Sequence, residues 1–548
     1  MKVMDVIAHG LLAEGVSFIT GFPHNQIIDA CSNLGIRPLM ARTERVAINI
    51  ADGYSRMSAG RSVGVVAVQF GPGIENGSGA VAQAFADGSG ILVLPGGYET
   101  REAGVTPNFR AEDNLRQVTK AVMSVNHPDS AALFLIRSFG LLRTGKPGPV
   151  VVEIPDDLMT AETSDRAAKY EPVAAGLTLA NPNEIEAVIK AVSEAKHPVF
   201  VAGRGVLHSG AWVELRELAE LLHVPVLSTL AGKSAFPEDH PLALGTGGLS
   251  RPAPVDQFLA EADLVVGFGT SFTRSHYTVR MPDGVRIIQV TNDPQDVAKS
   301  YRTERLVLGD LQLVLPQLKA VAAESKPRSD YRDSPAAQLV RERKRRFLDA
   351  WSPRLECDAE PISPYRVVFE LMRAVDKTRT VVTHDSGNPR DQIVPFYEAI
   401  VPCGYIGWGK STQLGSGLGL IMGAKLAKPD WLAVNLMGDA SFGMVGLDIE
   451  TAVRCQIPIL TIVLNNGLMG GYEEHLPIAT RKHNVHLQGG NYRDVALALG
   501  ARAERVEKVA ELAPALANAI RATKEGFPAV VEVLTRPEPV FPIGPVGH

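Results

Sequence analysis

The stretch Gly438-Asp439-Ala440-Ser441-Phe442, followed later by Asn465-Asn466-Gly467, decides the fold class of this chain. An apolar run (WLAVNLM) leads into the first turn, and a second one (IPILTIVL) leads into the other. Residues 444–455, between them, have a helix-like pattern. The order strand, turn, helix, strand, turn predicts neighbouring parallel strands. Both polar turns then lie at the carboxyl ends of those strands, where open α/β sheets bind ligands.

The side chains of these two turns suit a magnesium ion and a phosphorylated ligand. Asp439 and Asn466 offer hard oxygen ligands from two loops, which Mg²⁺ prefers. The backbone N–H groups at the start of a helix beside Asp439 can bind phosphate. A Gly-Asp pair alone is a common turn, so only the combination of the two turns at this spacing is specific.

A second set of motifs lies near the amino terminus. The sequence reads Arg42-Thr43-Glu44-Arg45-Val46-Ala47, followed by Ala51-Asp52-Gly53-Tyr54-Ser55-Arg56. Gly21-Phe22-Pro23 precedes it, and Gly71-Pro72-Gly73 with Asn76 follows it. Taken alone, Glu44 is a solvated acid at the start of a helix, where a negative charge is favourable.

Together, the two sets resemble the thiamine-diphosphate (ThDP) enzyme superfamily. The resemblance is to the group that contains acetolactate synthase, pyruvate oxidase, 2-ketoacid decarboxylase and 2-hydroxyacyl-CoA lyase, and it covers nearly the whole chain. One departure is visible, because the family usually has Gly-Asp-Gly where this chain has Ala440. A methyl group is tolerated there if the residue has negative φ.

The fold expected from this resemblance is α/β, with three open parallel-sheet domains. They are a pyrimidine-binding domain (residues 1–172), a central domain (180–325) and a diphosphate-binding domain with a short tail (361–548), with a linker at 326–360. Each domain contains four apolar runs with the pattern of strands. The runs are VSFIT, SVGVVAV, GILVLPG and GPVVVEIP in the first domain, HPVFVAG, VPVLSTL, DLVVGFG and RIIQVT in the second, and TVVTHD, LAVNLMGD, ILTIVLNN and AVVEVLT in the third.

The resemblance also implies roles for single residues. Glu44 would hydrogen-bond the aminopyrimidine ring of the cofactor and help to activate it, and burial would raise its pKa. Leu414 would be the bulky residue that bends the cofactor, although ordinary core packing is the alternative. The metal ligands would be Asp439, Asn466 and the backbone carbonyl of Leu468. The full set of cofactor-binding residues would be Pro23, Glu44, Gly73, Asn76, Asp385, Ser386, Gly387, Asn388, Leu414, Gly438, Asp439, Ala440, Ser441, Asn466, Leu468 and Met469.

The substrate pocket is predicted less sharply. His24 is a candidate catalytic acid or base, or a donor to a substrate carboxylate, and a structural loop histidine is the alternative. The other candidates are Gln69, Phe70, Tyr472, Glu473 and His475, and for the acids an exposed helix surface is the alternative.

The central domain leaves three possibilities open. The segment TLAGKSAFPEDHP, residues 229–241, resembles acetolactate synthase. Relatives that use a flavin bind FAD in this domain, and relatives that act on acyl-CoA bind the ADP part of CoA there. Gly203-Arg204-Gly205 alone is weak as a nucleotide motif. A domain without any nucleotide is therefore the third possibility.

Composition excludes several classes of protein. The 548 residues carry a net charge of −5, and the basic run at residues 341–346 is interrupted by an acid, so nucleic-acid binding is not expected. The four cysteines form no CxxC pair, which argues against a zinc site or a disulfide framework. Neither a membrane span nor a signal peptide is predicted, so a cytoplasmic location is expected.

The expected activity is ThDP- and Mg²⁺-dependent cleavage or formation of a C–C bond next to a carbonyl. The most concrete version is an acetolactate synthase-like decarboxylation and carboligation of a 2-ketoacid. The alternatives are a 2-hydroxyacyl-CoA or oxalyl-CoA lyase, and a catalytically silent regulatory protein of the same fold. Because the family builds its site between subunits, a homodimer or homotetramer is expected.

Overall fold

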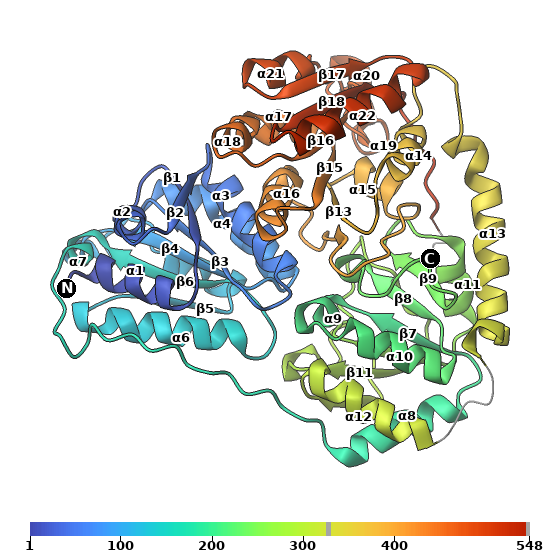
Figure 1. Cartoon of the computed structure of the whole chain (residues 1–548), viewed down its shortest axis with the longest axis horizontal. Helices are drawn as coiled ribbons and strands as arrows, with labels where there is room; N and C mark the ends of the chain where they lie inside the picture. Colours follow the sequence, from blue (N-terminus) through green and yellow to red (C-terminus); the bar gives the residue numbers. More distant parts are fainter. Residues whose placement is uncertain (325–329, 544–548) are drawn as a thin grey trace.

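The computed structural model describes residues 1–324 and 330–543, and it contains three α/β domains (Figure 1). Each domain is built on one six-stranded sheet in which all paired strands are parallel. The predicted fold class is therefore confirmed. The predicted domain limits stay a prediction, and residues 326–329 of the expected linker and 544–548 of the expected tail lie outside the described residues.

The amino-terminal domain has the strand order β2-β1-β3-β4-β6-β5. The apolar residues on both faces of β1, β3, β4 and β6 are buried under helices, as a parallel sheet requires. The strands are β1 (Phe18–Phe22), β2 (Arg37–Met40), β3 (Gly64–Val68), β4 (Ile91–Gly97), β5 (Ala121–Ser124) and β6 (Val150–Pro155). The helices are α1 (Val3–Ala13), α2 (Gln26–Asn33), α3 (Glu44–Met57), α4 (Pro72–Ala86), α5 (Ala111–Leu115), α6 (Ala131–Arg143) and α7 (Asp156–Met159).

The central domain has a different strand order, β12-β11-β10-β7-β8-β9. The chain starts in the middle of this sheet, at β7, builds outward to β9, and then returns to add β10, β11 and β12 on the other side of β7. The strands are β7 (Pro198–Ala202), β8 (Val226–Thr229), β9 (Ala243–Gly247), β10 (Leu264–Phe268), β11 (Arg286–Thr291) and β12 (Arg305–Leu308). The helices are α8 (Pro182–Glu194), α9 (Arg204–Ser209), α10 (Trp212–Leu222), α11 (Ala253–Glu261) and α12 (Leu311–Glu324).

A long helix, α13 (Pro335–Leu355), connects the central and carboxy-terminal domains along the outside of the molecule (Figure 1). Its first turn is capped by the Ser334 hydroxyl, which accepts the Ala337 N–H. The basic run of the sequence lies on this helix, where Arg343 pairs with Glu261 and Arg346 with Glu342. The run is therefore a charged helix face with acidic neighbours.

The carboxy-terminal domain has the order β14-β13-β15-β16-β18-β17. The chain then turns back to the central domain, where the Arg251 N–H donates to the Pro542 carbonyl. The strands are β13 (Thr380–His384), β14 (Tyr405–Ile406), β15 (Leu432–Gly438), β16 (Leu460–Asn465), β17 (Arg502–Val506) and β18 (Ala529–Leu534). The helices are α14 (Pro364–Ala374), α15 (Asn388–Ile393), α16 (Ser416–Ala427), α17 (Asp439–Val445), α18 (Ile449–Arg454), α19 (Tyr472–His475), α20 (Pro477–His483), α21 (Tyr492–Ala498) and α22 (Val509–Lys524).

The single helix expected at residues 444–455 is wrong in its detail. The structure has α17 from Asp439, a 3-10 turn at Gly446–Asp448, and then α18. The carboxylate of Asp448, at the end of that turn, is buried and accepts the Arg42 N–H at 2.8 Å and the Thr451 hydroxyl at 2.8 Å. The helix is interrupted because this contact with the amino-terminal domain fixes the chain at Asp448.

Helices α3 and α16 hold the amino- and carboxy-terminal domains together. A Cβ atom on Gly53 would lie 2.0 Å from the Leu420 carbonyl oxygen, and one on Gly423 would lie 2.0 Å from the Ile50 carbonyl oxygen. Only glycine permits this approach of the two backbones. The packing fixes the position of Glu44, at the start of α3, relative to the start of α16.

In the described part of the chain, no helix is both long and apolar enough to cross a membrane.

Candidate functional site

A cavity of about 250 Å³ opens at the carboxyl ends of β13, β15 and β16. The chain adds β14 on one side of β13 and then β15 on the other side. The cavity lies beside this change of direction. This is the position at which open α/β sheets bind ligands. The residues predicted from sequence that line it are Ser386, Gly387, Asn388, Leu414, Gly438, Asp439, Ala440, Ser441, Asn466, Leu468 and Met469.

Asp439 is the first residue of α17, and its carboxylate is held by backbone N–H groups. One oxygen accepts the Ala440 N–H at 2.8 Å, and the other accepts the Gly467 N–H at 2.8 Å. Burial raises the pKa of this carboxyl, while these hydrogen bonds oppose the rise. A carboxylate has four acceptor positions, so Asp439 keeps capacity for a cation in the cavity.

The two adjacent asparagines of the second turn have different surroundings. The Asn465 amide donates to the buried Glu532 carboxylate at 2.7 Å and is part of the core. Asn466 lines the cavity, and its side-chain oxygen accepts the Leu468 N–H at 3.0 Å. The structure therefore brings Asp439, Asn466 and Leu468 to one place, as the sequence predicts.

Asp385 is not among the residues that line the cavity, although its three successors are. It is fully buried, and its carboxylate accepts N–H groups from Gly415 at 2.8 Å and Gly417 at 2.9 Å. A hydrogen bond with the Ser441 side chain also reaches it. Asp385 thus fixes the backbone immediately after Leu414, which places that side chain at the cavity wall.

Ala440, the departure from the family motif, lies inside helix α17 and is not among the residues with positive φ. The methyl group therefore meets the condition under which an alanine is tolerated here.

The candidates from the amino-terminal domain form a separate group. They lie at the carboxyl ends of β1 and β3 and at the start of α3 and α4, and they are Pro23, His24, Glu44, Gln69, Phe70, Gly73 and Asn76. A Cβ atom on Gly73 would lie 3.7 Å from a Glu44 carboxylate oxygen and 2.9 Å from the Gln69 Cβ, so these residues are neighbours. His24 and Pro23 are exposed.

Glu44 is a buried acid. Burial raises its pKa, and a hydrogen bond with the Asn76 side chain opposes the rise. The Thr43 hydroxyl caps its helix by accepting the Val46 N–H at 3.2 Å. Glu44 is not among the residues described around the 250 Å³ cavity.

The remaining substrate candidates lie on the surface. Glu473 and His475 on α19 are exposed, and Tyr472 is partly exposed. None of the three is among the residues described around the cavity, which ends along this loop at Gly470. Their predicted roles stay predictions.

The central domain contains a second cavity, of about 120 Å³, at the carboxyl ends of β7, β10 and β11. Basic side chains line it from three domains, namely Lys146, Arg204 and Lys410. The Lys410 ammonium donates to the Ser271 hydroxyl at 2.9 Å, and burial lowers its pKa. Gly205 and Gly269 lie in close backbone contact at its base.

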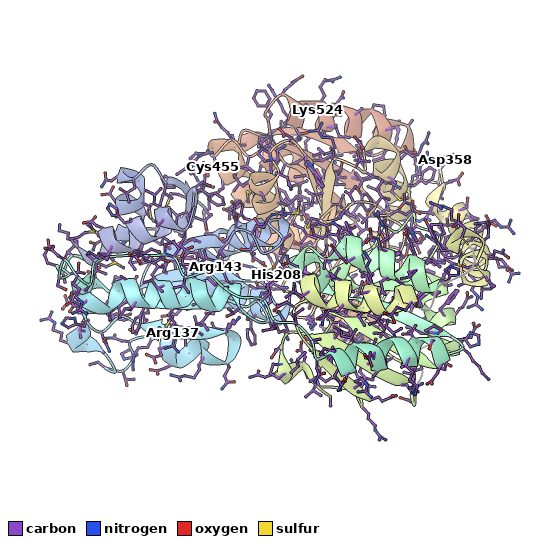
Figure 2. The ribbon with its side chains drawn as sticks, turned by 60° about the horizontal axis from the view of Figure 1, so that its bottom comes forward. Arg137, Arg143, His208, Asp358, Cys455 and Lys524 are labelled. Carbon is purple, nitrogen blue, oxygen red and sulfur yellow. The ribbon has the colours of Figure 1, made fainter. Side chains whose placement is uncertain are left out.

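Charged groups also meet where the three domains join. Arg56 forms buried ion pairs with Asp52 at 2.8 Å and Asp87 at 3.1 Å, and it donates to the Gly407 carbonyl. Arg143 and His208 line a small cavity on the boundary between the amino-terminal and central domains (Figure 2). Burial lowers the pKa of His208 to about 4, so its ring is neutral at pH 7.

Sequence reasoning missed part of the first cavity's wall. Arg390, Thr412 and Arg536 come from the carboxy-terminal domain, and Tyr277 comes from the central domain. Arg390 follows the predicted loop Asp385–Asn388 so closely that its position could have indicated a role. No local pattern marks Tyr277, because only the packing of the domains brings it there.

Family comparison agrees with this architecture. Three models of thiamine pyrophosphate enzymes match the chain: the N-terminal TPP binding domain at residues 1–123, the central domain at 185–318 and the C-terminal TPP binding domain at 385–533. The chain belongs to the thiamine pyrophosphate enzymes. Together the three family models cover most of its length, in the expected order.

Individual relatives support the same group. The chain is 29% identical to the probable acetolactate synthase large subunit of Methanocaldococcus jannaschii, over 100% of this chain and 94% of that protein. It is 28% identical to acetolactate synthase isozyme 3 large subunit of Escherichia coli strain K12, over 85% and 82% of the two chains. It is also 28% identical to glyoxylate carboligase of Escherichia coli O157:H7, over 97% and 93%.

The residues of the first cavity fit the cofactor of this family. A phosphorylated group with a divalent cation needs oxygen ligands and N–H or hydroxyl donors together. The cavity offers both kinds, with Asp439 and Asn466 on one side and Ser386 and Asn388 on another.

Proposed function

We propose that this protein is a ThDP- and Mg²⁺-dependent enzyme that decarboxylates a 2-ketoacid and joins the remaining acyl unit to a second carbonyl compound. The observation that carries the proposal is the convergence of Asp439, Asn466, Leu468 and Leu414 on one cavity. The names of the relatives, acetolactate synthases and a glyoxylate carboligase, favour this reaction within the family.

In this proposal the cation is held by the Asp439 carboxylate, the Asn466 side-chain oxygen and the Leu468 carbonyl. Ser386, Asn388 and Ser441 offer hydroxyl and amide groups to the diphosphate. The hydrogen bonds from Ala440 and Gly467 already orient the Asp439 carboxylate, so little reorganisation accompanies binding. Magnesium is the expected ion because these ligands are all oxygen atoms.

When bound, ThDP would supply a carbon nucleophile and an electron sink for decarboxylation. The protein's part is to orient the cofactor and to move protons. Leu414 would pack against the bound cofactor, and Glu44 would hold a proton at its aminopyrimidine ring. A buried carboxyl with a raised pKa suits that exchange near neutral pH.

Because Glu44 does not line the cavity of its own chain, we propose that the Glu44 of a second copy completes the site. Large apolar side chains on α17 and the turn after it support a further protein surface there. Met444 is 55% exposed and Leu447 is 59% exposed. Such exposed apolar groups favour association. A homodimer is the smallest assembly that meets this need, and a homotetramer is two such dimers.

The central cavity supports a nucleotide as a second ligand. Counted from its own first strand, the central sheet has the order 3-2-1-4-5-6, which is that of dinucleotide-binding folds. The cavity lies at the ends of β7 and β10, where that order reverses, and Lys146 and Lys410 suit phosphate groups. FAD would accompany the carboligase reaction. An ADP or CoA nucleotide would instead favour a 2-hydroxyacyl-CoA or oxalyl-CoA lyase.

Two measurements test the proposal. Mass spectrometry and absorbance of the cofactors released from the purified protein identify ThDP and distinguish flavin from CoA or ADP. The protein is then supplied with ThDP, Mg²⁺ and pyruvate, and both CO₂ and the carboligation product are quantified. A protein that binds no ThDP in the presence of Mg²⁺ would contradict the whole proposal. ThDP binding without CO₂ release from pyruvate or glyoxylate would contradict the reaction.

A further inference from the structure

Two Asn-Gly pairs occur in the sequence, Asn76-Gly77 and Asn466-Gly467. In such a pair the backbone nitrogen of the glycine can attack the side-chain carbonyl carbon of the asparagine and close a five-membered ring. The reacting groups belong to neighbouring residues, so they are held within reach of each other. Glycine has no Cβ atom to hinder the attack. The first pair lies inside helix α4, whereas the second lies in the turn after β16.

The backbone nitrogen of Gly467 faces a carboxylate. Its N–H donates to one Asp439 oxygen at 2.8 Å, and a longer bond of 3.2 Å runs to the Asn465 side-chain oxygen. The other Asp439 oxygen accepts the Ala440 N–H at 2.8 Å, which holds the carboxylate in place. A carboxylate that accepts the N–H of an attacking nitrogen can take over its proton as the new bond forms.

The side-chain carbonyl of Asn466 is held by a donor. Its oxygen accepts the Leu468 N–H at 3.0 Å. This oxygen gains negative charge during the attack, and an N–H that already points at it stabilises that charge. In helix α4 the Gly77 N–H is instead directed at a backbone carbonyl one turn earlier, which is not a base. The turn at Asn466 therefore offers both groups that the reaction needs.

Water has access to the Asn466-Gly467 pair from two sides. Asn466 lines the cavity of about 250 Å³, called the cofactor cavity below, and with Gly467 it also lines an open groove of about 670 Å³. A Cβ atom on Gly467 would find only the Gln488 carbonyl oxygen within 4 Å, at 3.5 Å. The turn thus has room for the ring to form and for water to open it.

We infer that Asn466 is a deamidation site, at which the surrounding groups promote conversion of the asparagine to aspartate or isoaspartate. The Gly467 nitrogen bonds to the Asn466 side-chain carbonyl carbon, and the bond from that carbon to the side-chain nitrogen breaks. This nitrogen leaves as ammonia, together with the proton that Gly467 loses by way of Asp439. Water then opens the succinimide ring at either of its carbonyl carbons. The reaction consumes water and releases ammonia, and it needs no oxidant or reductant.

The consequence for the cofactor site rests on the proposed function. In the isoaspartate product the main chain is longer by one CH₂ group, which displaces the Leu468 carbonyl that follows. The Asn466 side-chain oxygen and this carbonyl are both proposed ligands of the cation. Molecules that carry isoaspartate should therefore lose Mg²⁺-dependent ThDP binding, so the capacity for cofactor declines slowly and irreversibly as the protein ages.

Peptide mass spectrometry of the full-length protein, incubated without cofactor near neutral pH, measures the reaction. The replacement of the amide NH₂ by OH is followed over time at Asn466 and at Asn76 in the same sample. Conversion at Asn466 is expected to be faster by about tenfold or more, because one positioned base contributes about 10²- to 10⁴-fold. In urea, where the chain is unfolded, the two rates should approach each other. Equal rates in the folded protein, or a faster rate at Asn76, would overturn the inference.

Asp439→Asn tests the role of the carboxylate. The amide oxygen of the variant can still accept the Gly467 N–H but is a far weaker base, so conversion at Asn466 should slow by about tenfold or more. The rate at Asn76 should stay the same. Asp448→Asn is a matched control, because that buried acid also accepts a backbone N–H at 2.8 Å, from Arg42. An undiminished rate at Asn466 in Asp439→Asn would overturn the inference. If this variant does not fold, the folded and unfolded forms of the unchanged protein still decide.

Titration of the aged protein with ThDP separates the inference from the proposed function. At saturating Mg²⁺, the fraction of protein that binds ThDP should fall in step with the fraction converted to isoaspartate. Conversion without any loss of ThDP binding would leave the deamidation site standing and contradict the proposed ligand role of Asn466. An intact Asn466 after long incubation would overturn the inference and leave the proposed function untouched.

Discussion

The amino- and carboxy-terminal domains share one strand order but carry different functional groups at the carboxyl ends of their strands. Counted from the first strand of each domain, both sheets have the order 2-1-3-4-6-5. In the carboxy-terminal domain the strand ends surround an open cavity with acid, amide and hydroxyl groups. In the amino-terminal domain the equivalent ends carry a buried glutamate beside Gln69 and Gly73.

This difference shows that the loops, and not the sheet, decide what each domain contributes. One fold hosts many functions because side chains at the strand ends vary freely while the buried strands keep the framework. In the proposed function the two sets are complementary, since one would offer ligands for a metal and a diphosphate and the other a proton-exchanging acid. The following variants test each half of this comparison separately.

The largest effect is expected for Asp439→Ala in the carboxy-terminal set. Loss of a direct metal ligand should weaken Mg²⁺-dependent ThDP binding by more than about 100-fold. Replacing a residue that only hydrogen-bonds a metal ligand already weakens metal binding by up to about 100-fold. Calorimetric titration of ThDP at saturating Mg²⁺ measures it. Asp448→Asn is the control, because that buried acid contacts Arg42 and Thr451 away from the cavity. Tight ThDP binding by Asp439→Ala would contradict the ligand assignment.

The next effect is expected for Glu44→Gln in the amino-terminal set. The amide keeps the shape of the side chain but cannot exchange the proton, so kcat should fall about 10²- to 10⁴-fold, as for loss of a general acid or base. ThDP affinity should change little. Steady-state rates of CO₂ release and a ThDP titration of the same preparation separate the two quantities. Unchanged turnover would remove Glu44 from the mechanism.

The same variant should also change the dependence of stability on pH. Burial raises the pKa of Glu44 in the folded state. Its carboxyl therefore favours folding below its unfolded pKa, and this contribution is lost as the pH rises through the folded pKa. At pH 8, Glu44→Gln should raise the Tm of the cofactor-free protein, because the neutral amide avoids the cost of a buried charge. At pH 4 the two proteins should melt together. A lower Tm at pH 8 would contradict the sign.

The smallest effect is expected for Ala440→Gly, which restores the usual family residue. Because Ala440 has helical geometry, glycine is not needed for the backbone, and it should cost about 1 kcal/mol of local helix stability. ThDP affinity should stay unchanged, as measured by titration. A clear gain in affinity would show that the methyl group of Ala440 hinders the diphosphate.

The strands that the sequence predicts, and those it misses, differ by their place in the sheets. The four apolar runs found in each domain correspond to the four inner strands, for example β1, β3, β4 and β6. Both edge strands of all three sheets are missed: β2, β5, β9, β12, β14 and β17. Inner strands of a parallel sheet are buried on both faces and give continuous apolar runs. Most edge strands are short or partly exposed, as in Arg37–Met40, and lack that pattern.

The candidate site shows a similar division. Asp439 and Asn466 follow directly after inner strands, and Ser386 lies two residues after one, so strong local patterns point to them. A functional role for Glu44 could be inferred only from the family resemblance, because an acid at the start of a helix is common. Tyr277 and Lys410 reach their cavities through the packing of domains, which no local pattern encodes. The catalytic and binding roles of all these residues stay predictions.

The cofactor cavity and the central cavity are separated by a thin wall of shared residues, called the partition below. Tyr277 lines both of them, and along one short segment Gly409 and Lys410 face the central cavity while Thr412 and Leu414 face the other. Whatever displaces this partition toward one cavity narrows that cavity and widens the other. The central domain and the cofactor site therefore cannot diverge independently in evolution, because a bulkier residue on either face of the partition has to be accommodated by both chambers.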